Sequence, residues 1–331
     1  MSEQPLIEQH ASDSRQNIKL LFPDVALLAR LEQLSVAAGS RIKGTMAGKL
    51  RSSSLGGSQE FADYRPYAPG DDIRRLDWNV YGRTGRAYMR QYWDEQELSV
   101  NLLIDVSRSM TFGGTDNKLH YAVRLAACIA YASLSGEDRI ALKLYGDSRL
   151  ENQLMPVRGK ASLPIVFSML AETIRKEEKL RSALSDAASA HTPPSLSMSE
   201  AINAAGGKPF KSGVAFLLTD AMYEEGIEEA LTALLAAGQK IVFIHLLSPD
   251  ELEPDLSGEL KLIDSELGTG KDIAVSAPLI DKYKRAVDGY RQYLRQLCGE
   301  RGIDYLFIDT GRPLSQAVQR DLLQRGVLRS K

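Results

Sequence analysis

The stretch LLIDVSRSM, residues 102–110, decides how the rest of the chain is interpreted, because an apolar run stops there at a carboxylate flanked by hydroxyls. The residues before Asp105 are almost all apolar, which is typical of a strand buried on both faces. Ser107 and Ser109 follow at alternate positions, and residues 111–118 have the Gly, Thr, Asp and Asn of a loop. Hydroxyls and a carboxylate at the end of a buried strand form a candidate metal site.

From residue 98 onward, strand-like apolar runs alternate with helix-like segments. The strand-like runs are 98–105, 140–146, 214–220, 240–247 and 304–310, and the helix-like segments are 117–135, 163–177, 226–238 and 277–302. This alternation predicts an α/β fold, a Rossmann-like and mostly parallel sheet with helices on both faces. Residues 151–157 are expected to add a short strand beside 140–146, and residues 258–275 an edge hairpin.

The region before residue 98 has a different composition. Residues 1–16 are polar and predict a disordered tail, whereas the apolar spacing in 24–38 predicts a helix capped by Asp24. We therefore expect an N-terminal helix and an Arg/aromatic extension over 17–97, packed on the sheet. The main domain is expected over 98–310, followed by a C-terminal helix over 311–331.

Composition limits the classes of function. The 331 residues are 44% hydrophobic and 25% charged with a net charge of −2, so there is no bulk attraction to nucleic acid or to an anionic membrane. Two cysteines in helix-like segments and four scattered histidines do not have zinc-ligand spacing. The sequence shows neither a secretory signal nor a run of about 18 apolar residues. These features predict a cytoplasmic protein.

A second strand-like run, 214–220, ends in Asp220 and is followed by another loop. Ligands of parallel sheets bind outside the carboxyl ends of the strands, where the strand order reverses. If the two strands are neighbours, Asp105 and Asp220 converge on one crevice. Carboxylates and hydroxyls are hard oxygen ligands, suited to Mg²⁺ or Mn²⁺ rather than zinc. The alternative is that Asp105 only caps the turn that follows it.

These motifs resemble a known family. DVSRSM (105–110) matches the D-x-S-x-S metal-ion-dependent adhesion site (MIDAS) of von Willebrand factor A-type domains, and LLTDAM (217–222) resembles their later strand-end Asp motif. The upstream stretch that begins RPYAPGDDIRRLDW (65–78) closely resembles the signature of the DUF58 family, bacterial proteins of unknown function with a von Willebrand A-like domain. The resemblance covers residues 40–310 and implies that fold.

The resemblance also implies a role for each residue of the site. Ser107 and Ser109 would be direct ligands, and Asp105 and Asp220 would hold the metal directly or through water. The family's third element is a Thr, but here Leu196 stands at that position in PSLSMSEAI (194–202). Its neighbours Ser195 and Ser197 could substitute with a small shift.

Residues 64–95 interleave arginines with aromatic residues. Such a composition grips single-stranded nucleic acid, but the segment is equally rich in aspartates that can pair with the arginines in a structural layer. The structural interpretation predicts that Trp78 and Trp93 are at least half buried.

Two classes of function remain. The resemblance implies a non-enzymatic, metal-dependent interaction module, an adaptor or co-chaperone of a MoxR-type AAA+ ATPase whose carboxylate completes the metal site. The alternative is a Mg²⁺-dependent phosphohydrolase of haloacid-dehalogenase type, which needs D-x-D for a nucleophile and a general acid. Ser107 stands where that second Asp is required, so we expect no enzyme. Nucleic-acid binding through residues 64–95 is a further alternative.

Overall fold

The computed structural model describes residues 4–24, 26–37, 61–92, 98–112, 117–185, 197–205, 211–254, 258–263 and 270–331. The chain divides into two compact units. Met1–Ile42 and Leu98–Lys331 form one, here called the sheet unit, and Lys43–Glu97 form the other, here called the Arg/aromatic unit. Among the described residues, no helix is long and apolar enough to cross a membrane.

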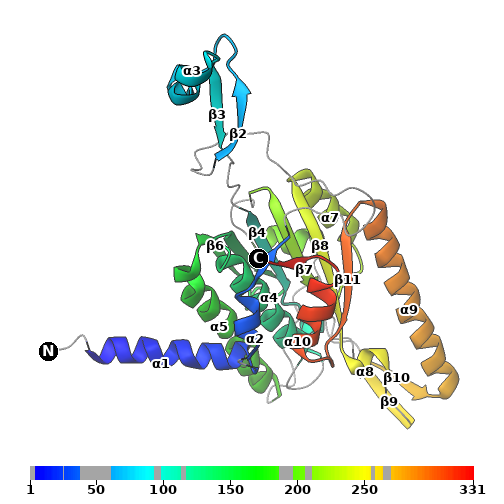
Figure 1. The fold of residues 1–331 in the computed structure, drawn as a ribbon. Coiled ribbons are helices and arrows are strands. Elements are labelled where there is room, and N and C mark those ends of the chain that lie inside the picture. Colours follow the sequence, from blue (N-terminus) through cyan, green and yellow to red (C-terminus); the bar gives the residue numbers. More distant parts are fainter. Residues whose placement is uncertain are drawn as a thin grey trace. The chain divides into compact units, whose positions relative to one another are not determined.

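The sheet unit is built on six strands in the order β11-β8-β7-β4-β5-β6 (Figure 1). Their bounds are β4 Ser99–Asp105, β5 Arg139–Tyr145, β6 Asn152–Arg158, β7 Gly213–Thr219, β8 Gln239–Leu247 and β11 Asp304–Asp309. Five strands are parallel, and only β6 at one edge runs antiparallel, against β5. The predicted α/β fold is confirmed, and so is the short strand beside β5.

Strand β4 lies at the point where the strand order reverses. It pairs with β5 on one side and with β7 on the other, and both pairs are parallel. The chain therefore moves outward from β4 to β5 and β6, then returns to the opposite side of β4 for β7, β8 and β11. The carboxyl ends of β4 and β7 are adjacent, and such a switch point is where sheets of this class bind ligands.

Helices cover both faces of the sheet (Figure 1). The first face carries α4 (Lys118–Leu134) and α5 (Leu163–Ser185), joined to β6 by the short η4 (Lys160–Ser162). The second face carries α6 (Met198–Ala204), α7 (Ile227–Ala236) and α9 (Ala277–Glu300). Along β4, Leu102 and Ile104 join the first apolar cluster and Leu103 joins the second, because successive strand side chains point to opposite faces.

Helix α4 is the most deeply buried helix of this core. Asn117 caps its N-terminus by accepting a hydrogen bond from the His120 amide, and the helix is buried over nearly its whole length. Cys128 on α4 and Cys298 on α9 are both buried and free, as expected for apolar fillers.

The chain ends differ from the sequence predictions. The tail predicted to be disordered contains α1 (Gln4–Leu21), whose last residue is fully buried in the core. The helix predicted over 24–38 is shorter, α2 (Ala26–Leu31), because residues after it form β1 (Leu34–Val36). β1 pairs antiparallel with β12 (Leu328–Ser330). This long-range pairing overrides local helix propensity at both ends. The C-terminal helix is α10 (Leu314–Gln316), continued by a π-helical turn, Ala317–Leu323.

The predicted hairpin exists, but not at the edge of the main sheet. β9 (Gly258–Ile263) and β10 (Gly270–Val275) form a separate two-stranded sheet, and within the part of the chain that the structure describes neither pairs with another strand. Between β8 and this hairpin lies one helical turn, α8 (Pro249–Leu252), which carries a capping box between Ser248 and Glu251.

The Arg/aromatic unit is a hairpin with short helices. β2 (Phe61–Pro66) pairs antiparallel with β3 (Tyr88–Tyr92), and between them lie η1 (Ile73–Arg75) and α3 (Trp78–Thr84). Asp77 organises the unit. Its carboxylate accepts hydrogen bonds from Asn79 and Val80 at the start of α3, from the Tyr64 hydroxyl and from Arg90. The packing of the Arg/aromatic unit on the sheet stays a prediction.

One prediction for this unit is wrong. Trp78 is 63% exposed rather than at least half buried. A single hairpin with one short helix has little interior, and among the described side chains of this unit Met89, 3% exposed, is the buried apolar one. The ring of Trp78 contacts Tyr81 edge-on, one turn along α3. Trp93 lies outside the described residues.

Candidate metal site

The structure brings the two strand-end aspartates of the sequence analysis together. Asp105 is the last residue of β4, and Asp220 directly follows β7. After Asp105 the chain turns into η2 (Arg108–Thr111), for which Ser107 is the N-cap residue. The adjacency of β4 and β7 therefore places a hydroxyl-bearing loop beside a second carboxylate, as the sequence predicted.

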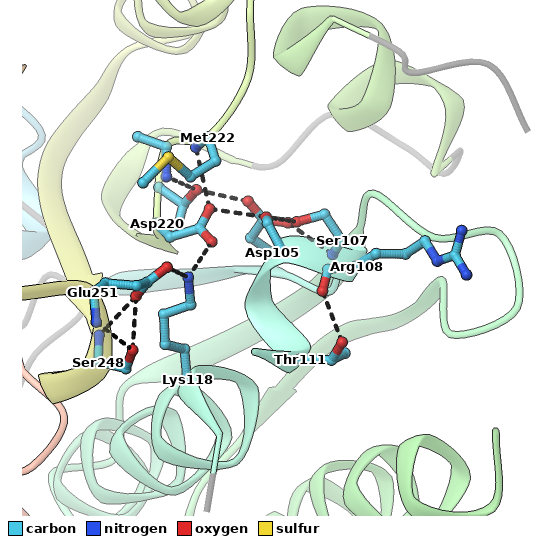
Figure 2. Close-up of polar contacts among 12 residues, drawn as sticks. Asp105, Ser107, Arg108, Thr111, Lys118, Asp220, Met222, Ser248 and Glu251 are labelled. Atoms are coloured by element: carbon cyan, nitrogen blue, oxygen red, sulfur yellow. Dashed lines mark hydrogen bonds and ion pairs between the residues drawn. The ribbon is translucent and has the colours of Figure 1, made fainter. Parts of the chain in front are cut away.

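Three oxygen atoms form a compact cluster at this point. The Oγ atoms of Ser107 and Ser109 are 3.1 Å apart, and Ser109 Oγ lies 3.2 Å from Asp220 Oδ1. Neighbouring oxygens around an octahedral Mg²⁺ with ligand distances of about 2.1 Å are about 3 Å apart. The spacing and the chemistry of these three donors therefore fit a small, hard cation. The neighbouring Arg108 side chain points away from the cluster (Figure 2).

Asp105 supports the cluster from behind. Its side chain is fully buried, and one oxygen accepts from the Ser107 amide at 2.9 Å and from the Tyr223 hydroxyl at 3.1 Å. The other oxygen accepts from the Thr219 hydroxyl at 2.6 Å. Burial, followed by the charge of Asp220, raises the pKa of the Asp105 carboxyl to about 7. Asp105 therefore fixes the loop, and its negative charge is costly in the absence of a cation.

The turn after β7 aims Asp220 at the serines. Ala221 adopts a positive φ of 56°, which is unfavourable for a residue with a Cβ. Its amide donates to the Thr219 hydroxyl at 2.8 Å, and the Met222 amide donates to Asp220 Oδ1 at 3.1 Å. The strained backbone thus belongs to the segment that positions the second carboxylate.

A glycine lies beside the site at the end of β5, where a larger residue would not fit. Gly146, which follows β5, has a φ of 114°, and a Cβ there would lie 3.0 Å from the Ser107 amide and 3.1 Å from Asp105 Oδ1. Both its conformation and its surroundings therefore require glycine.

Two charged residues of the site were missed by the sequence analysis. Lys118, the first residue of α4, is fully buried and its Nζ donates to Asp220 Oδ2 at 2.7 Å and to Glu251 Oε1 at 2.5 Å (Figure 2). Burial acts to lower the pKa of Lys118, but Asp220 and Glu251 outweigh it and the net pKa is raised. The one available signal was a lysine in the buried stripe of an apolar helix. The S-x-x-E pattern at Ser248 indicated only a helix cap for Glu251.

His245 on β8 borders the site without adding charge. Its Nε2 lies 3.1 Å from the Asp220 carbonyl oxygen, and its Nδ1 lies 2.8 Å from the Tyr305 hydroxyl. Burial lowers the pKa of this imidazole to about 4, so it is neutral at pH 7.

The predicted third element of the site is only partly described. Ser195 and Leu196 lie outside the described residues. Ser197 is the N-cap of α6, where its hydroxyl and amide are engaged in a capping box with Glu200. Among the described residues there is no group of three or more His, Cys, Asp and Glu that could hold a metal. The candidate site therefore depends on its two carboxylates together with the hydroxyls of Ser107 and Ser109.

Comparison with known proteins places the chain in a family. A family model described as "Protein of unknown function DUF58" matches residues 63–292. Uncharacterized proteins of Mycobacterium tuberculosis and Mycobacterium bovis are 26% identical to the chain over 292 residues, covering 87% of this chain and 86% of each relative.

Solved structures were also compared. The crystal structure of a conserved hypothetical protein, BatB from Bacteroides thetaiotaomicron, is 16% identical with a TM-score of 0.36, covering 69% of this chain and 98% of that one. An aerotolerance-related membrane protein of Bacteroides fragilis is 15% identical with a TM-score of 0.38, covering 68% and 98%. At these scores the fold assignment rests on the sheet topology itself.

Proposed function

The chain belongs to the DUF58 family, whose function is unknown, and on that premise we propose that it is a non-enzymatic protein-interaction module that depends on a divalent metal. The observation that carries the proposal is the oxygen cluster of Ser107, Ser109 and Asp220 at the switch point of the sheet. These residues would bind Mg²⁺ or Mn²⁺, while Asp105 holds the ligand loop. A carboxylate from a partner protein would complete the coordination.

The partner that we propose is a MoxR-type AAA+ ATPase, with this chain as its adaptor or co-chaperone. This part of the proposal is supported by the family resemblance, which points to such ATPases as the proteins that DUF58-like proteins work beside. The site is suited to the role because Ser109 is only partly buried, so a partner's side chain can approach the cluster.

The surroundings of Asp105 argue against the haloacid-dehalogenase alternative. That chemistry needs an accessible carboxylate as nucleophile, whereas Asp105 is fully buried and both of its oxygens accept hydrogen bonds. A second acid two residues later is also required, and Ser107 occupies that position.

Thermal unfolding tests the metal site. With chelator and then with millimolar Mg²⁺ or Mn²⁺, the wild type should gain roughly 2.7 kcal/mol at a hundredfold excess over the dissociation constant. Asp105→Ala relieves the repulsion from Asp220 but removes the acceptor for the Ser107 amide and for the Thr219 and Tyr223 hydroxyls, so it should be less stable than wild type in chelator, and it should gain almost nothing from metal. Ser109→Ala should gain less than the wild type.

The matched control for Ser109→Ala is Ser133→Ala. Ser133 is a buried serine on α4 whose hydroxyl donates to the Ile129 carbonyl oxygen, away from the cluster. It should lose some stability with and without metal, and keep the full metal-dependent gain. Equal gains in wild type and Asp105→Ala would mean that the cluster is no metal site.

The partner is tested by pull-down and mass spectrometry. Wild type and Ser109→Ala serve as baits, each with Mg²⁺ and with chelator. An AAA+ ATPase recovered only by metal-loaded wild type is the expected result. Recovery of the same ATPase by all four samples would mean that the interaction does not require the metal.

The exposure of Trp78 favours a second candidate function, single-stranded nucleic-acid binding by the Arg/aromatic unit. Trp78 and Tyr81 are exposed on α3, and exposed rings near arginines can stack on bases. Fluorescence anisotropy with labelled single-stranded DNA and RNA tests this function. Salt-sensitive binding that Trp78→Ala abolishes would support it, and absence of binding at low salt would eliminate it.

A further inference from the structure

Lys118 connects three elements at the candidate metal site. It begins α4, and its ammonium group reaches Asp220 after β7 and Glu251 in α8 (Figure 2). Lys118 and Asp220 are fully buried, and Glu251 is 12% exposed. Two carboxylates at hydrogen-bonding distance make this lysine a fixed positive charge.

The two oxygens of Asp220 face different partners. Oδ1 accepts from Ser109 and from the Met222 amide, on the side of the oxygen cluster. Oδ2 accepts from Lys118. A metal ion on the cluster and the ammonium of Lys118 would therefore share one carboxylate from opposite sides, and in a buried site two cations this close repel each other strongly.

The ammonium group of Lys118 also compensates negative charge at the site when no metal is bound. Asp105, Asp220 and Glu251 bring three carboxylates into one buried region, and isolated buried charges are very costly. Without Lys118 the site would depend on a divalent cation for its stability. With Lys118 one charge is compensated before any metal binds.

We propose that Lys118 is the residue that sets the affinity of the metal site, keeping it weak enough for the cation to exchange. The proposal rests on the proposed metal-dependent function and assigns a regulator to that site. By attracting Asp220 from the side opposite to the serines, the ammonium lowers the affinity for Mg²⁺ and lets the fold persist in the metal-free state.

A charge series tests the proposal. Lys118→Met removes the positive charge while keeping an unbranched apolar stem, and Glu251→Gln removes a negative charge from the far side of the lysine. The double variant Lys118→Met/Glu251→Gln leaves one fewer unpaired carboxylate than Lys118→Met, so it serves where the single variant does not fold without metal. Lys143→Met is the control, because Lys143 is a second buried lysine, on β5, that donates to the Ile202 carbonyl oxygen.

Mg²⁺ binding is measured by isothermal titration calorimetry in one buffer, at the same mildly alkaline pH for every variant. Lys118→Met should bind at least about tenfold tighter than wild type, and Glu251→Gln about tenfold weaker. The double variant should bind tighter than wild type, because the charge next to Asp220 is removed while the loss of Glu251 acts from farther away. Lys143→Met should keep the wild-type affinity. In chelator, Lys118→Met should be the least stable variant, and Mg²⁺ should restore it most.

The outcomes separate this proposal from the proposed function. If wild type binds Mg²⁺ and both Lys118→Met and the double variant bind it no tighter, the affinity-setting role is wrong while the metal site stands. If only the Lys118 variants bind Mg²⁺, the role of Lys118 is supported and the metal-dependent function of the natural protein is not. If no variant binds, both proposals fail.

Discussion

Two ion pairs of almost equal length, one in each unit of the chain, show how differently the units use charge. Lys118 and Asp220 in the sheet unit are 2.7 Å apart, and neither side chain is exposed. Arg65 and Asp71 in the Arg/aromatic unit are 2.6 Å apart, with 35% and 19% of their side chains exposed. Water screens the second pair but not the first, so equal geometry implies very unequal energies.

The difference extends to the surroundings of each pair. In the sheet unit, Asp105 and Glu251 add further carboxylates to the buried region around Lys118, so that carboxylates there outnumber the one ammonium group. In the Arg/aromatic unit, Asp71 and Asp77 each have their own arginine. The first arrangement is suited to binding a ligand, whereas the second is suited to holding a small fold together.

The largest expected effect is on the buried pair. Lys118→Met leaves Asp220 and Glu251 as unpaired neighbouring charges, and breaking a buried pair in this way typically costs about 3–5 kcal/mol. Urea unfolding in the presence of chelator, followed by far-UV circular dichroism, measures the loss. Circular dichroism is the suitable signal because both tryptophans, Trp78 and Trp93, belong to the other unit. If Lys118→Met loses no more free energy of unfolding than Lys143→Met does, the ion pairs of Lys118 with Asp220 and Glu251 do not stabilise the fold.

The next effect is the pH dependence of the metal-free protein. The pKa of Asp105 is raised by burial and by Asp220 to about 7 in the folded state, above its ordinary value of about 3.9. Protons therefore bind the folded state more tightly. This contribution to stability is fully present below about pH 4 and is lost as the pH rises through about 7.

Asp105→Asn should flatten that dependence, because the amide does not titrate in this range. Free energies of unfolding at about pH 5 and about pH 8 in chelator compare the two proteins. The wild type should be less stable at the higher pH, and the difference between the two pH values should shrink in Asp105→Asn. An unchanged difference would assign the titration to another group.

These two predictions concern Asp105, whose role could be predicted from the sequence, and Lys118, whose role could not. Asp105 and Asp220 were predictable because each ends an apolar run, and neighbouring parallel strands bring such ends together. Lys118 and Glu251 were not, since they are 133 residues apart along the chain and only the three-dimensional fold joins them. Local patterns assign Lys118 to a helix start and Glu251 to a helix cap, and neither pattern reveals a buried charge.

The predictions for the chain ends and for Trp78 were wrong for a related reason. The pairing of β1 with β12 joins residues about three hundred positions apart, so the spacing within 24–38 predicts a longer helix than α2. Trp78 was predicted to be at least half buried because the arginines and aspartates of its segment were expected to pair in a structural layer, but burial depends on how much structure surrounds a side chain. A unit with a two-stranded hairpin at its centre has too little.

A smaller effect is expected at the centre of the Arg/aromatic unit. Asp77→Ala removes the N-cap of α3 together with the acceptor for Tyr64 and Arg90. It should be the most damaging single substitution in this unit, and it should leave the sheet unit unchanged. Tryptophan fluorescence during urea unfolding should therefore shift to lower urea while the circular dichroism transition stays in place. A joint shift of both signals would mean that the units unfold together.

The smallest effect is expected for Arg65→Met, the surface counterpart of Lys118→Met. Both substitutions delete one cationic partner of an aspartate, but Asp71 remains in contact with water and keeps the hydrogen bond from the Ala68 amide. The urea transition followed by tryptophan fluorescence should therefore stay within experimental error, and added salt should not separate the two proteins.

The carboxyl group of Asp71 still reports on the deleted partner. The hydrogen bond from Arg65, followed by that from Ala68, lowers the pKa of Asp71 to about 2, so any stabilisation from this group is present above about pH 4 and is lost as the pH falls through about 2. In Arg65→Met the pKa should rise toward the ordinary value of about 3.9, which carboxyl NMR titration can measure. A raised pKa with unchanged stability would establish that the pair forms in solution and that solvent screening removes most of its energy. A large loss of stability would contradict the comparison, because an exposed pair would then behave like the buried one at Lys118.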